Sequence, residues 1–393
     1  MDVKFINKNT LIYSVNTDFT RTIRDNTFHS LVTDPPYGWK FMGKKWDYSV
    51  PSVEEWVEIL RVLKPGAFGL VACGTRTQHR MAVNLEDAGF EIRDVIAWIY
   101  GSGFPKSTDI AKSIDKHLGV EREVVGTAKG MGRQNPDWNG KNKGRSENYY
   151  FPEYEKTIAT SDLAKQWDGW GTALKPAMEL WTLCRKPVVG TTTENVMTYG
   201  TGTINIDECR IPLNGENCPT GSAKRVFSSN EYATDKVYGN NKATPLTGRF
   251  PANLIHDGSD EVLSYFPDAK GQQGDLIGHD RIIESPNGIY GKQPPRHDAI
   301  KRSDDSKSAA RFFYCAKASP SERGKFNNHE TVKPLSLMKY LCRLITPKNG
   351  TIIDPYMGSG TTLLAAESEG FYAVGIDKEL KSYEIAIRRC SGK

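Results

Sequence analysis

The 393-residue sequence contains no apolar run long enough to cross a membrane, and its first residues lack the charged-then-apolar pattern of a secretory signal. Its seven cysteines are scattered, and they do not form the two closely spaced pairs that a structural zinc site requires. We therefore expect reduced thiols, no bound metal, no contact with a membrane and a cytoplasmic location. The net charge of +5 is only mildly basic, so it permits nucleic-acid binding without requiring it.

Two common nucleotide-binding signatures are also missing. The glycine-rich turn at residues 358–360 is not followed by Gly-Lys-Ser/Thr, which excludes a Walker loop, and it does not match Gly-x-Gly-x-x-Gly, which weakens a nicotinamide site. What is present is an apolar strand at 351–353, an acidic residue, this turn and a helix. Small residues let the backbone approach a ligand closely, and the N-terminus of a helix faces the bound group.

A second strand, residues 371–376, follows and ends in Asp377. An acidic residue at this position of a nucleotide-binding βαβ unit commonly holds ribose hydroxyls. Asp377 could equally cap the helix expected over 378–389, or it could serve both roles.

Near the other end of the chain, the apolar strand 29–33 leads directly into the tetrapeptide Asp34-Pro35-Pro36-Tyr37. Two consecutive prolines fix φ and remove backbone donors, so this turn presents carbonyl groups without a competing N–H. The tyrosine offers a flat face on which a base could stack. Any fold could use such a turn, but the second motif at 354–361 makes a coincidence improbable.

Together and in this order, the two motifs resemble those of DNA methyltransferases that modify exocyclic amino groups, in the permuted arrangement with the catalytic motif first. The segments 169–176, 248–257 and 308–317 look like those of phage and prophage members. The resemblance implies an α/β, Rossmann-like methyltransferase fold with a mostly parallel sheet, circularly permuted motif order and a large irregular insertion. It also implies S-adenosylmethionine as cofactor and double-stranded DNA as partner.

The resemblance also assigns roles to residues. Asp34 would accept one proton of the target amine, the carbonyl of Pro35 would accept the other, and Tyr37 would stack on the flipped base, with Pro36 completing the catalytic motif. Thr331 and Lys333, in the stretch before the cofactor strand, would contact the methionine carboxylate. The full set expected to bind the cofactor is Thr33, Thr331, Lys333, Asp354, Pro355, Tyr356, Gly358, Ser359, Gly360, Thr361 and Asp377.

Along the chain, strands alternate with helices over 28–104 and again over 327–390, which indicates one parallel sheet built from two sequence-distant halves. We divide the chain into a catalytic half (1–120), an insertion with the target-recognition region (121–310) and a cofactor-binding half (311–393). Within the insertion, the basic, glycine-rich stretch with Lys141, Lys143 and Arg145 is a candidate DNA contact. The alternative is a solvated loop.

Several functions remain open within the resemblance. Family members that act on cytosine more often carry Ser where this chain has Asp34, so methylation of adenine N6 is preferred over cytosine N4. An RNA or protein-glutamine substrate is a further alternative, as is a DNA-binding decoy without turnover. The intact acidic residues and Tyr37 argue against the decoy. A cognate restriction enzyme and a homodimer are both compatible with the sequence.

The basic stretch of the insertion gives a first testable expectation. Neutralising Lys141, Lys143 and Arg145 together should weaken DNA binding and reduce its salt dependence, because lost phosphate contacts release fewer counterions. Binding titrations at several salt concentrations measure both effects. An unchanged affinity and salt slope would make this stretch a solvated loop and place recognition elsewhere.

Overall fold

The computed structural model describes residues 1–39, 47–103, 107–129, 133–134, 149–150, 152–213, 248–269, 283–284, 292–293, 307–316 and 332–392. The chain forms two compact units: unit 1 comprises Met1–Gly101 with Met178–Lys393, and unit 2 comprises Ser102–Ala177. Within the described ranges, no helix is both long and apolar enough to cross a membrane.

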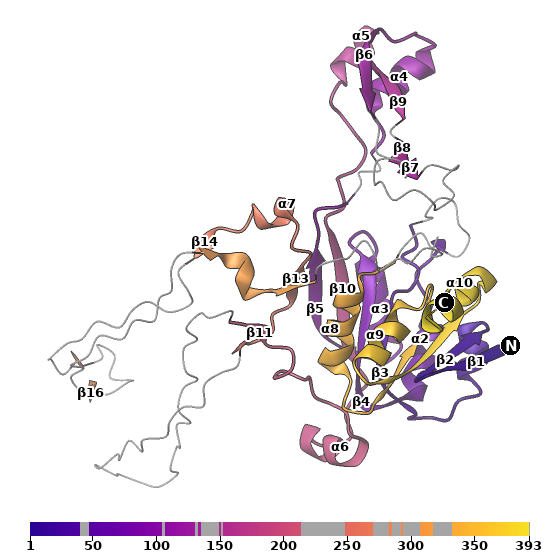
Figure 1. The fold of residues 1–393 in the computed structure, drawn as a ribbon, viewed down its shortest axis with the longest axis vertical. Helices are drawn as coiled ribbons and strands as arrows, with labels where there is room; N and C mark the ends of the chain where they lie inside the picture. The colour runs from indigo at the N-terminus through magenta and orange to yellow at the C-terminus, as the bar shows by residue number, and fades with distance from the viewer. Residues whose placement is uncertain are drawn as a thin grey trace. The chain divides into compact units, whose positions relative to one another are not determined.

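Unit 1 is built on one ten-stranded sheet (Figure 1). Neighbouring strands are parallel from β2 to β4 and from β5 to β18, whereas β1, at one edge, and β10, between β4 and β5, run antiparallel to their neighbours. The predicted α/β fold with a mostly parallel sheet is therefore confirmed. In spatial order the strands are β1 (Asp2–Ile6), β2 (Asn9–Tyr13), β20 (Tyr372–Asp377), β19 (Thr351–Asp354), β3 (Phe28–Thr33), β4 (Leu63–Gly74), β10 (Met178–Arg185), β5 (Glu91–Ile99), β13 (Leu254–His256) and β18 (Tyr314–Cys315).

The two sequence-distant halves of the chain meet between β3 and β19. Ser30 lies opposite Ile352 and Leu31 opposite Ile353 in this parallel pair. The prediction of one sheet assembled from both halves is thus confirmed. The pairing brings the ends of the two motif-bearing strands side by side.

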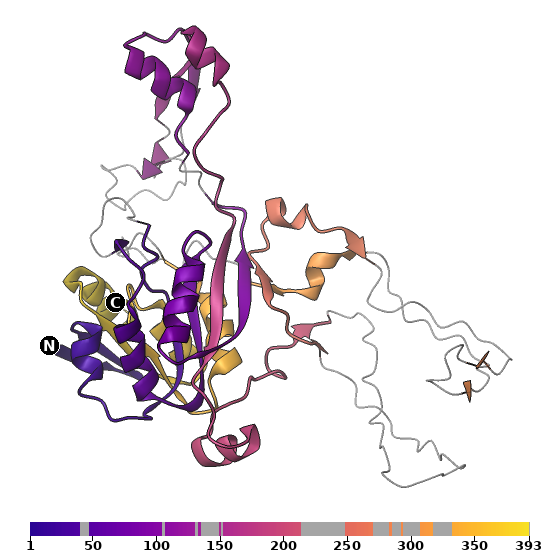
Figure 2. The same ribbon diagram turned by 180° about the vertical axis from the view of Figure 1, so that it is seen from behind.

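Two cores cover the two faces of the sheet, because successive residues of a strand point to opposite sides. Leu31 and Val71 belong to one core, and their neighbours Val32 and Leu70 belong to the other. Figures 1 and 2 show the two layers of helices from opposite sides. The first core is covered by α1 (Asn16–Thr20), α2 (Val53–Val62) and α3 (Gln78–Asp87), and the second by α8 (Leu335–Ile345), α9 (Thr361–Ser368) and α10 (Leu380–Cys390).

Helix α2 shows how local sequence sets the helix that forms one wall of the site. Ser52 accepts the N–H of Glu55, and Glu55 in turn accepts the N–H of Ser52, so the two residues cap the helix reciprocally. Trp56, Ile59 and Val62, spaced three residues apart, are buried against the sheet. The cap fixes where the first turn of α2 begins and so where Glu55 is held.

The range 121–310, expected as an insertion, also supplies parts of the central sheet. Strand β10 pairs with β4 and β5 along its length, and β13 pairs with β5 and β18. The functional division of the chain into catalytic, recognition and cofactor segments stays a prediction. Shorter elements of unit 1 are α6 (Thr192–Tyr199), α7 (Asp260–Leu263), η3 (Ala309–Phe312), β11 (Ile211–Pro212), β12 (Gly248–Arg249), β14 (Asp268–Ala269), β15 (Ile283–Glu284), β16 (Lys292–Gln293) and β17 (Lys307–Ser308).

Unit 2 is held together by a buried carboxylate. Asp115 accepts hydrogen bonds from Arg122 (2.9 Å), from the Ser161 hydroxyl (2.6 Å) and from the Thr160 N–H (3.1 Å). These bonds connect α4 to the loop before α5, and the hydrogen bond from the Ser161 hydroxyl is the main reason why the pKa of Asp115 lies below its ordinary value. The elements of this unit are α4 (Ile110–Leu118), β6 (Val124–Lys129), β7 (Arg133–Gln134), β8 (Tyr149–Tyr150), β9 (Glu153–Thr157) and α5 (Asp162–Gln166).

Candidate functional site

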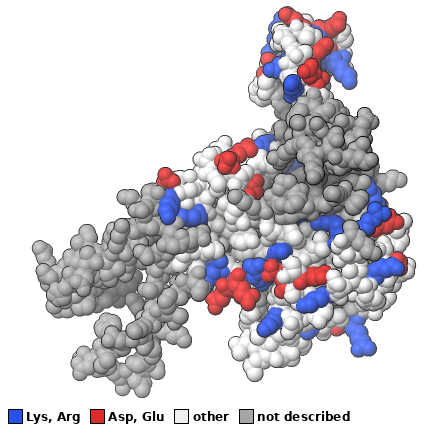
Figure 3. Space-filling model, in the orientation of Figure 1, with Lys and Arg blue, Asp and Glu red and all other residues white. Residues whose placement is uncertain are grey.

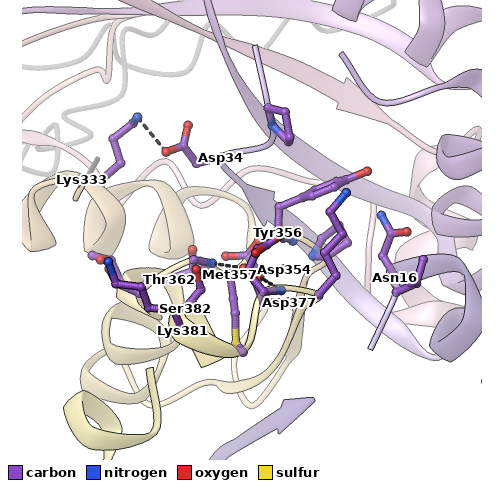
Figure 4. A pocket seen from close by; sticks show the side chains of 18 of the residues that line it. Asn16, Asp34, Lys333, Asp354, Tyr356, Met357, Thr362, Asp377, Lys381 and Ser382 are labelled. Atoms are coloured by element: carbon purple, nitrogen blue, oxygen red, sulfur yellow. Dashed lines mark hydrogen bonds and ion pairs between the residues drawn. The ribbon is translucent and has the colours of Figure 1, made fainter. Parts of the chain in front are cut away.

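The chain leaves β19 and β3 in opposite directions across the sheet. β19 leads through α9 to β20 on one side, and β3 leads through α2 to β4 on the other. A crevice opens at the carboxyl ends of two strands where the strand order reverses in this way. A pocket of about 300 Å³ lies there, lined by residues from both halves of the chain (Figure 4).

Most of the predicted site residues are brought together in this pocket. Those that line it are Asp34, Pro36, Lys333, Asp354, Pro355, Tyr356, Gly358, Ser359, Thr361 and Asp377. Thr33, Pro35, Tyr37 and Gly360 belong to the same segments but are not among its lining residues. Thr331, Lys141, Lys143 and Arg145 lie outside the described residues. The individual roles assigned to all these residues stay predictions.

Sequence reasoning missed part of the pocket wall, namely Val15, Asn16, Glu55, Met338, Met357, Thr362, Lys378, Glu379, Lys381 and Ser382. Val15 and Asn16 follow β2, the next parallel strand beyond β20, so the rule that ligands bind at the carboxyl ends of such strands could have found them. Glu55 accepts a hydrogen bond from the Tyr356 hydroxyl (2.9 Å) and one from Asn16 (3.3 Å). The capped first turn of α2 therefore fixes one side of the pocket.

The turn after β19 depends on its glycines. Gly358 and Gly360 have φ of 50° and 77°, a region that favours glycine, and Gly360 is the N-cap of α9. Arg389 of α10 donates to the Ser359 carbonyl, to the Ser359 hydroxyl and to the Thr361 hydroxyl. Arg389 thus fixes the turn, and Gly358, Ser359 and Thr361 line the pocket.

Asp354 ends β19 and is buried. Its Oδ1 accepts the hydroxyl of Thr33 at 2.7 Å and the N–H of Tyr356 at 3.1 Å. Burial raises the pKa of Asp354 to about 6, and the hydrogen bonds that it accepts only partly offset this effect. The Thr33 contact joins the end of β3 directly to the end of β19.

Asp377 ends β20 and faces the same pocket. Its Oδ2 accepts the N–H of Gly358 at 3.0 Å, and its Oδ1 accepts the N–H of Glu379 at 2.8 Å. Helix α10 begins after Glu379, so Asp377 both supports the turn into this helix and lines the pocket. Burial raises the pKa of Asp377 to about 7.

Two residues of the tetrapeptide after β3 lie in a cluster around a lysine side chain. We call it the lysine cluster, and its members are Asp34, Tyr37, Glu179 and Lys333. The Lys333 ammonium lies 2.8 Å from Asp34 Oδ2 and 3.0 Å from Glu179 Oε2, and it donates to the Tyr37 hydroxyl at 3.2 Å. The Tyr37 hydroxyl donates to Asp34 Oδ1 at 2.7 Å. Burial alone would lower the pKa of Lys333, but the carboxylates of Asp34 and Glu179 raise it above its ordinary value.

Two of the residues that hold this segment were absent from the sequence analysis. Glu179 comes from β10, and Asp47 accepts the backbone N–H groups of Tyr37 (2.7 Å), Gly38 (2.9 Å) and Trp39 (3.1 Å). Asp47 is only 2% exposed, so its bonds with these donors are shielded from water. The path of the chain after the two prolines is therefore set by a buried carboxylate.

The raised pKa of Asp377 leads to a pH prediction. An acidic residue whose folded pKa lies near 7 stabilises the fold fully below its unfolded value of about 4, and this contribution is lost as pH rises through 7. Replacing Asp377 by Asn removes the titration. The unfolding free energy of the wild type minus that of Asp377→Asn should therefore fall between pH 4 and pH 8 in the protein without cofactor. Denaturant unfolding at several pH values measures it, and a constant or rising difference contradicts the assignment.

Comparison with known proteins gives several short sequence matches. The chain is 44% identical over 61 residues to the type II methyltransferase M.HindIII of Haemophilus influenzae, covering 16% of this chain and 20% of that protein. It is 45% identical over 67 residues to M.BglI of Bacillus subtilis, covering 17% and 19%. The matched part thus spans about a fifth of the length of these relatives.

Solved structures align over nearly the whole chain, at low identity. A crystal structure of an M1.HpyAVI–SAM complex aligns with 97% of this chain and 98% of its own at 13% identity, with a TM-score of 0.40. PvuII DNA methyltransferase, described as cytosine-N4-specific, aligns with 99% and 90% at 11% identity, with a TM-score of 0.44.

A family model gives broader coverage than any of the sequence relatives above. The model described as DNA methylase, for N6 and N4 methyltransferases, matches residues 28–388. This range contains the tetrapeptide at 34–37, the lysine cluster, and the strands that end in Asp354 and Asp377. The chain accordingly belongs to the DNA methylase family of N6 and N4 methyltransferases.

Proposed function

We propose that this chain is an S-adenosylmethionine-dependent DNA methyltransferase that methylates the exocyclic N6 amine of adenine in double-stranded DNA. The observation that carries the proposal is the placement of Asp34, from the catalytic tetrapeptide, in one pocket with Asp354 and Asp377. The Asp34 carboxylate can accept an N–H of an amine and lies beside a pocket of the nucleotide-binding type. This arrangement suits the transfer of a methyl group to a base nitrogen.

The pocket suits the cofactor in size and in chemistry. Its volume of about 300 Å³ is at the lower end of the range for small-molecule sites. Its lining includes five carboxylates, from Asp34, Glu55, Asp354, Asp377 and Glu379, which suit a ligand that carries ribose hydroxyls, an amine and a sulfonium charge. Asp377 retains lone pairs beyond its two backbone bonds, so it can accept ribose hydroxyls. S-adenosylmethionine would supply the electrophilic methyl group there.

The residues after β3 would prepare the target amine. The lone pair of an exocyclic amine is delocalised into the ring, which makes the nitrogen a poor nucleophile. In the proposed mechanism, Asp34 accepts one N–H of the amine and the Pro35 carbonyl accepts the other, which draws electron density onto the nitrogen. The ring of Tyr37 stacks on the base. Direct transfer would form the nitrogen–carbon bond as the carbon–sulfur bond of the sulfonium breaks, leaving a neutral thioether. The amine proton would pass by way of Asp34 to solvent, so no cysteine nucleophile would be needed.

The base must leave the duplex to reach these residues, at a cost of a few kcal/mol. On the face shown in Figure 3, basic and acidic side chains of the described residues are interspersed. This pattern by itself does not mark a path for DNA. The proposed duplex contact therefore rests on the family and on the basic stretch with Lys141, Lys143 and Arg145.

Methylation of cytosine N4 is the alternative within the same family, and one experiment separates the two. Genomic DNA from cells that express the chain should contain N6-methyladenine at a defined sequence motif, detected by modified-base sequencing. N4-methylcytosine in its place would support the alternative, and DNA without either modification would contradict both. Cells that carry the empty vector give the background.

Cofactor binding is tested at Asp377. Asp377→Ala should weaken binding of S-adenosylmethionine by about 1.5–3 kcal/mol, because hydroxyl groups lose a charged acceptor. Isothermal titration calorimetry measures this change. Since the substitution also frees the N–H groups of Gly358 and Glu379, circular dichroism must show an intact fold. Unchanged affinity in a folded variant would remove this role.

Catalysis is tested at Asp34. Asp34→Ala should abolish methyl transfer to DNA while the cofactor still binds, because the acceptor for the amine is lost and β19 and β20 are untouched. The Lys333 ammonium keeps Glu179 as a partner in this variant, so the fold should persist. Radiolabelled methyl transfer measures the activity.

A matched control for this variant is Asp25→Ala. Asp25 pairs with Arg61 at the surface and is not among the residues that line the pocket, so this substitution should leave activity unchanged. Substantial activity in a folded Asp34→Ala protein would overturn the proposed catalytic role.

A further inference from the structure

The lysine cluster contains one more carboxylate than the proposed chemistry uses. An ammonium group has three donors, and those of Lys333 are taken by Asp34, Glu179 and the Tyr37 hydroxyl. The side chains of Lys333 and Glu179 are 9% and 19% exposed, so water screens these charges weakly. The position of Glu179 beside Lys333 therefore has electrostatic consequences for Asp34.

The charges of this cluster do not cancel. Asp34 and Glu179 each carry one negative charge and Lys333 one positive charge, which leaves one net negative charge. Without Glu179, Asp34 and Lys333 would form a neutral pair at 2.8 Å. A carboxylate neutralised at such a short distance stabilises a developing positive charge poorly, and the attacking amine nitrogen becomes positive as its new bond forms.

Glu179 is fixed in place by the sheet. Its backbone lies opposite Gly74 of β4 and opposite Trp98 of β5, so β10 is paired on both sides at this residue. Asp34 and Lys333 line the pocket, whereas Glu179 is not among its lining residues. Glu179 lies 3.0 Å from the Lys333 ammonium and 3.5 Å from the Tyr37 hydroxyl, so it can act on a bound base through these two side chains, of which Lys333 is the nearer and the charged one.

We propose that Glu179 is a positioning residue of methyl transfer: it neutralises the Lys333 ammonium, so that Asp34 keeps a full negative charge toward the target amine. This inference rests on the proposed function. It assigns to the antiparallel strand β10 a part in the chemistry, although β10 supplies none of the pocket lining. It also explains why a lysine can lie against the amine acceptor without disabling it.

The test compares Glu179→Gln with the wild type in single-turnover methyl transfer at saturating cofactor and DNA. Gln keeps the shape and one acceptor but removes the charge. The rate constant should fall about tenfold or more. The dissociation constants for S-adenosylmethionine and for DNA, and the melting temperature, should stay close to those of the wild type, which separates this role from a structural one.

Two further comparisons isolate the charge. Glu91→Gln makes the same change on the neighbouring strand, where Glu91 pairs with Arg185 at the opposite end of β10, and it should leave the rate unchanged. The rate constant of Glu179→Asp should exceed that of Glu179→Asn, because the two side chains have equal length and differ in charge. If Glu179→Gln does not fold, the comparison of these two variants still tests the effect of the charge.

A double-mutant cycle tests whether Glu179 acts through Lys333. In the Lys333→Met background, Glu179→Gln should change the residual rate by less than about twofold, because no ammonium remains to be neutralised. An equal loss in both backgrounds would overturn the proposal. A wild-type rate in Glu179→Gln, equal rates for the Asp and Asn variants, or a loss confined to cofactor affinity would also overturn it. Absence of methyl transfer by the wild type would instead contradict the proposed function.

Discussion

The pairing of β3 with β19 is the constraint on which the site depends. It joins strands that lie more than three hundred residues apart in the sequence, and it places Thr33 within 2.7 Å of Asp354 in a buried hydrogen bond. Both strands run in the same direction, so their carboxyl ends meet at one edge of the sheet. The tetrapeptide after β3 and the glycine turn after β19 can share a pocket only because of this register. A slip of one residue would turn every side chain of the strand to the opposite face.

This arrangement brings a buried acid, Asp354, and a half-buried acid, Asp377, to one edge of the sheet, where their ionisation works against the fold. Burial raises the pKa values of Asp354 to about 6 and of Asp377 to about 7. Both residues accept backbone N–H groups, which favours the charged form and limits the shift. Carboxyl groups whose pKa values are shifted in this way by burial are typical of functional sites. The destabilisation that they cause near neutral pH would be relieved by a ligand bearing hydroxyl or cationic groups.

The sequence predicted those parts of the structure that depend on local patterns. The strands before Asp34, Asp354 and Asp377 are recognisable because an apolar run that ends in turn residues has a direct physical meaning. Glu179 was not recognisable as part of the site. It lies in a segment with weak periodicity, and its proximity to Lys333 follows from the insertion of β10 between β4 and β5, a contact between distant residues that no local pattern encodes. Asp47 was missed for a related reason, since an acid in a loop gives no sign that three backbone N–H groups will point at it.

The carboxylates at the two ends of the pocket differ in the donors that they accept. At the β19–β20 end, Asp354 accepts threonine hydroxyls and a backbone N–H, and Asp377 accepts two backbone N–H groups; none of these donors carries a net charge. At the β3 end, Asp34 is satisfied by the Tyr37 hydroxyl and by a lysine whose charge is shared with a second carboxylate. In the proposed mechanism Asp34 accepts an N–H of the target amine, and a lysine whose charge is shared with Glu179 would orient Asp34 without neutralising it. The Thr33–Asp354 hydrogen bond joins the two ends, and the Asp34 carboxylate contributes to the raised pKa of Asp354. Because residues that share such contacts are energetically coupled, a substitution at one end of the pocket should also be felt at the other.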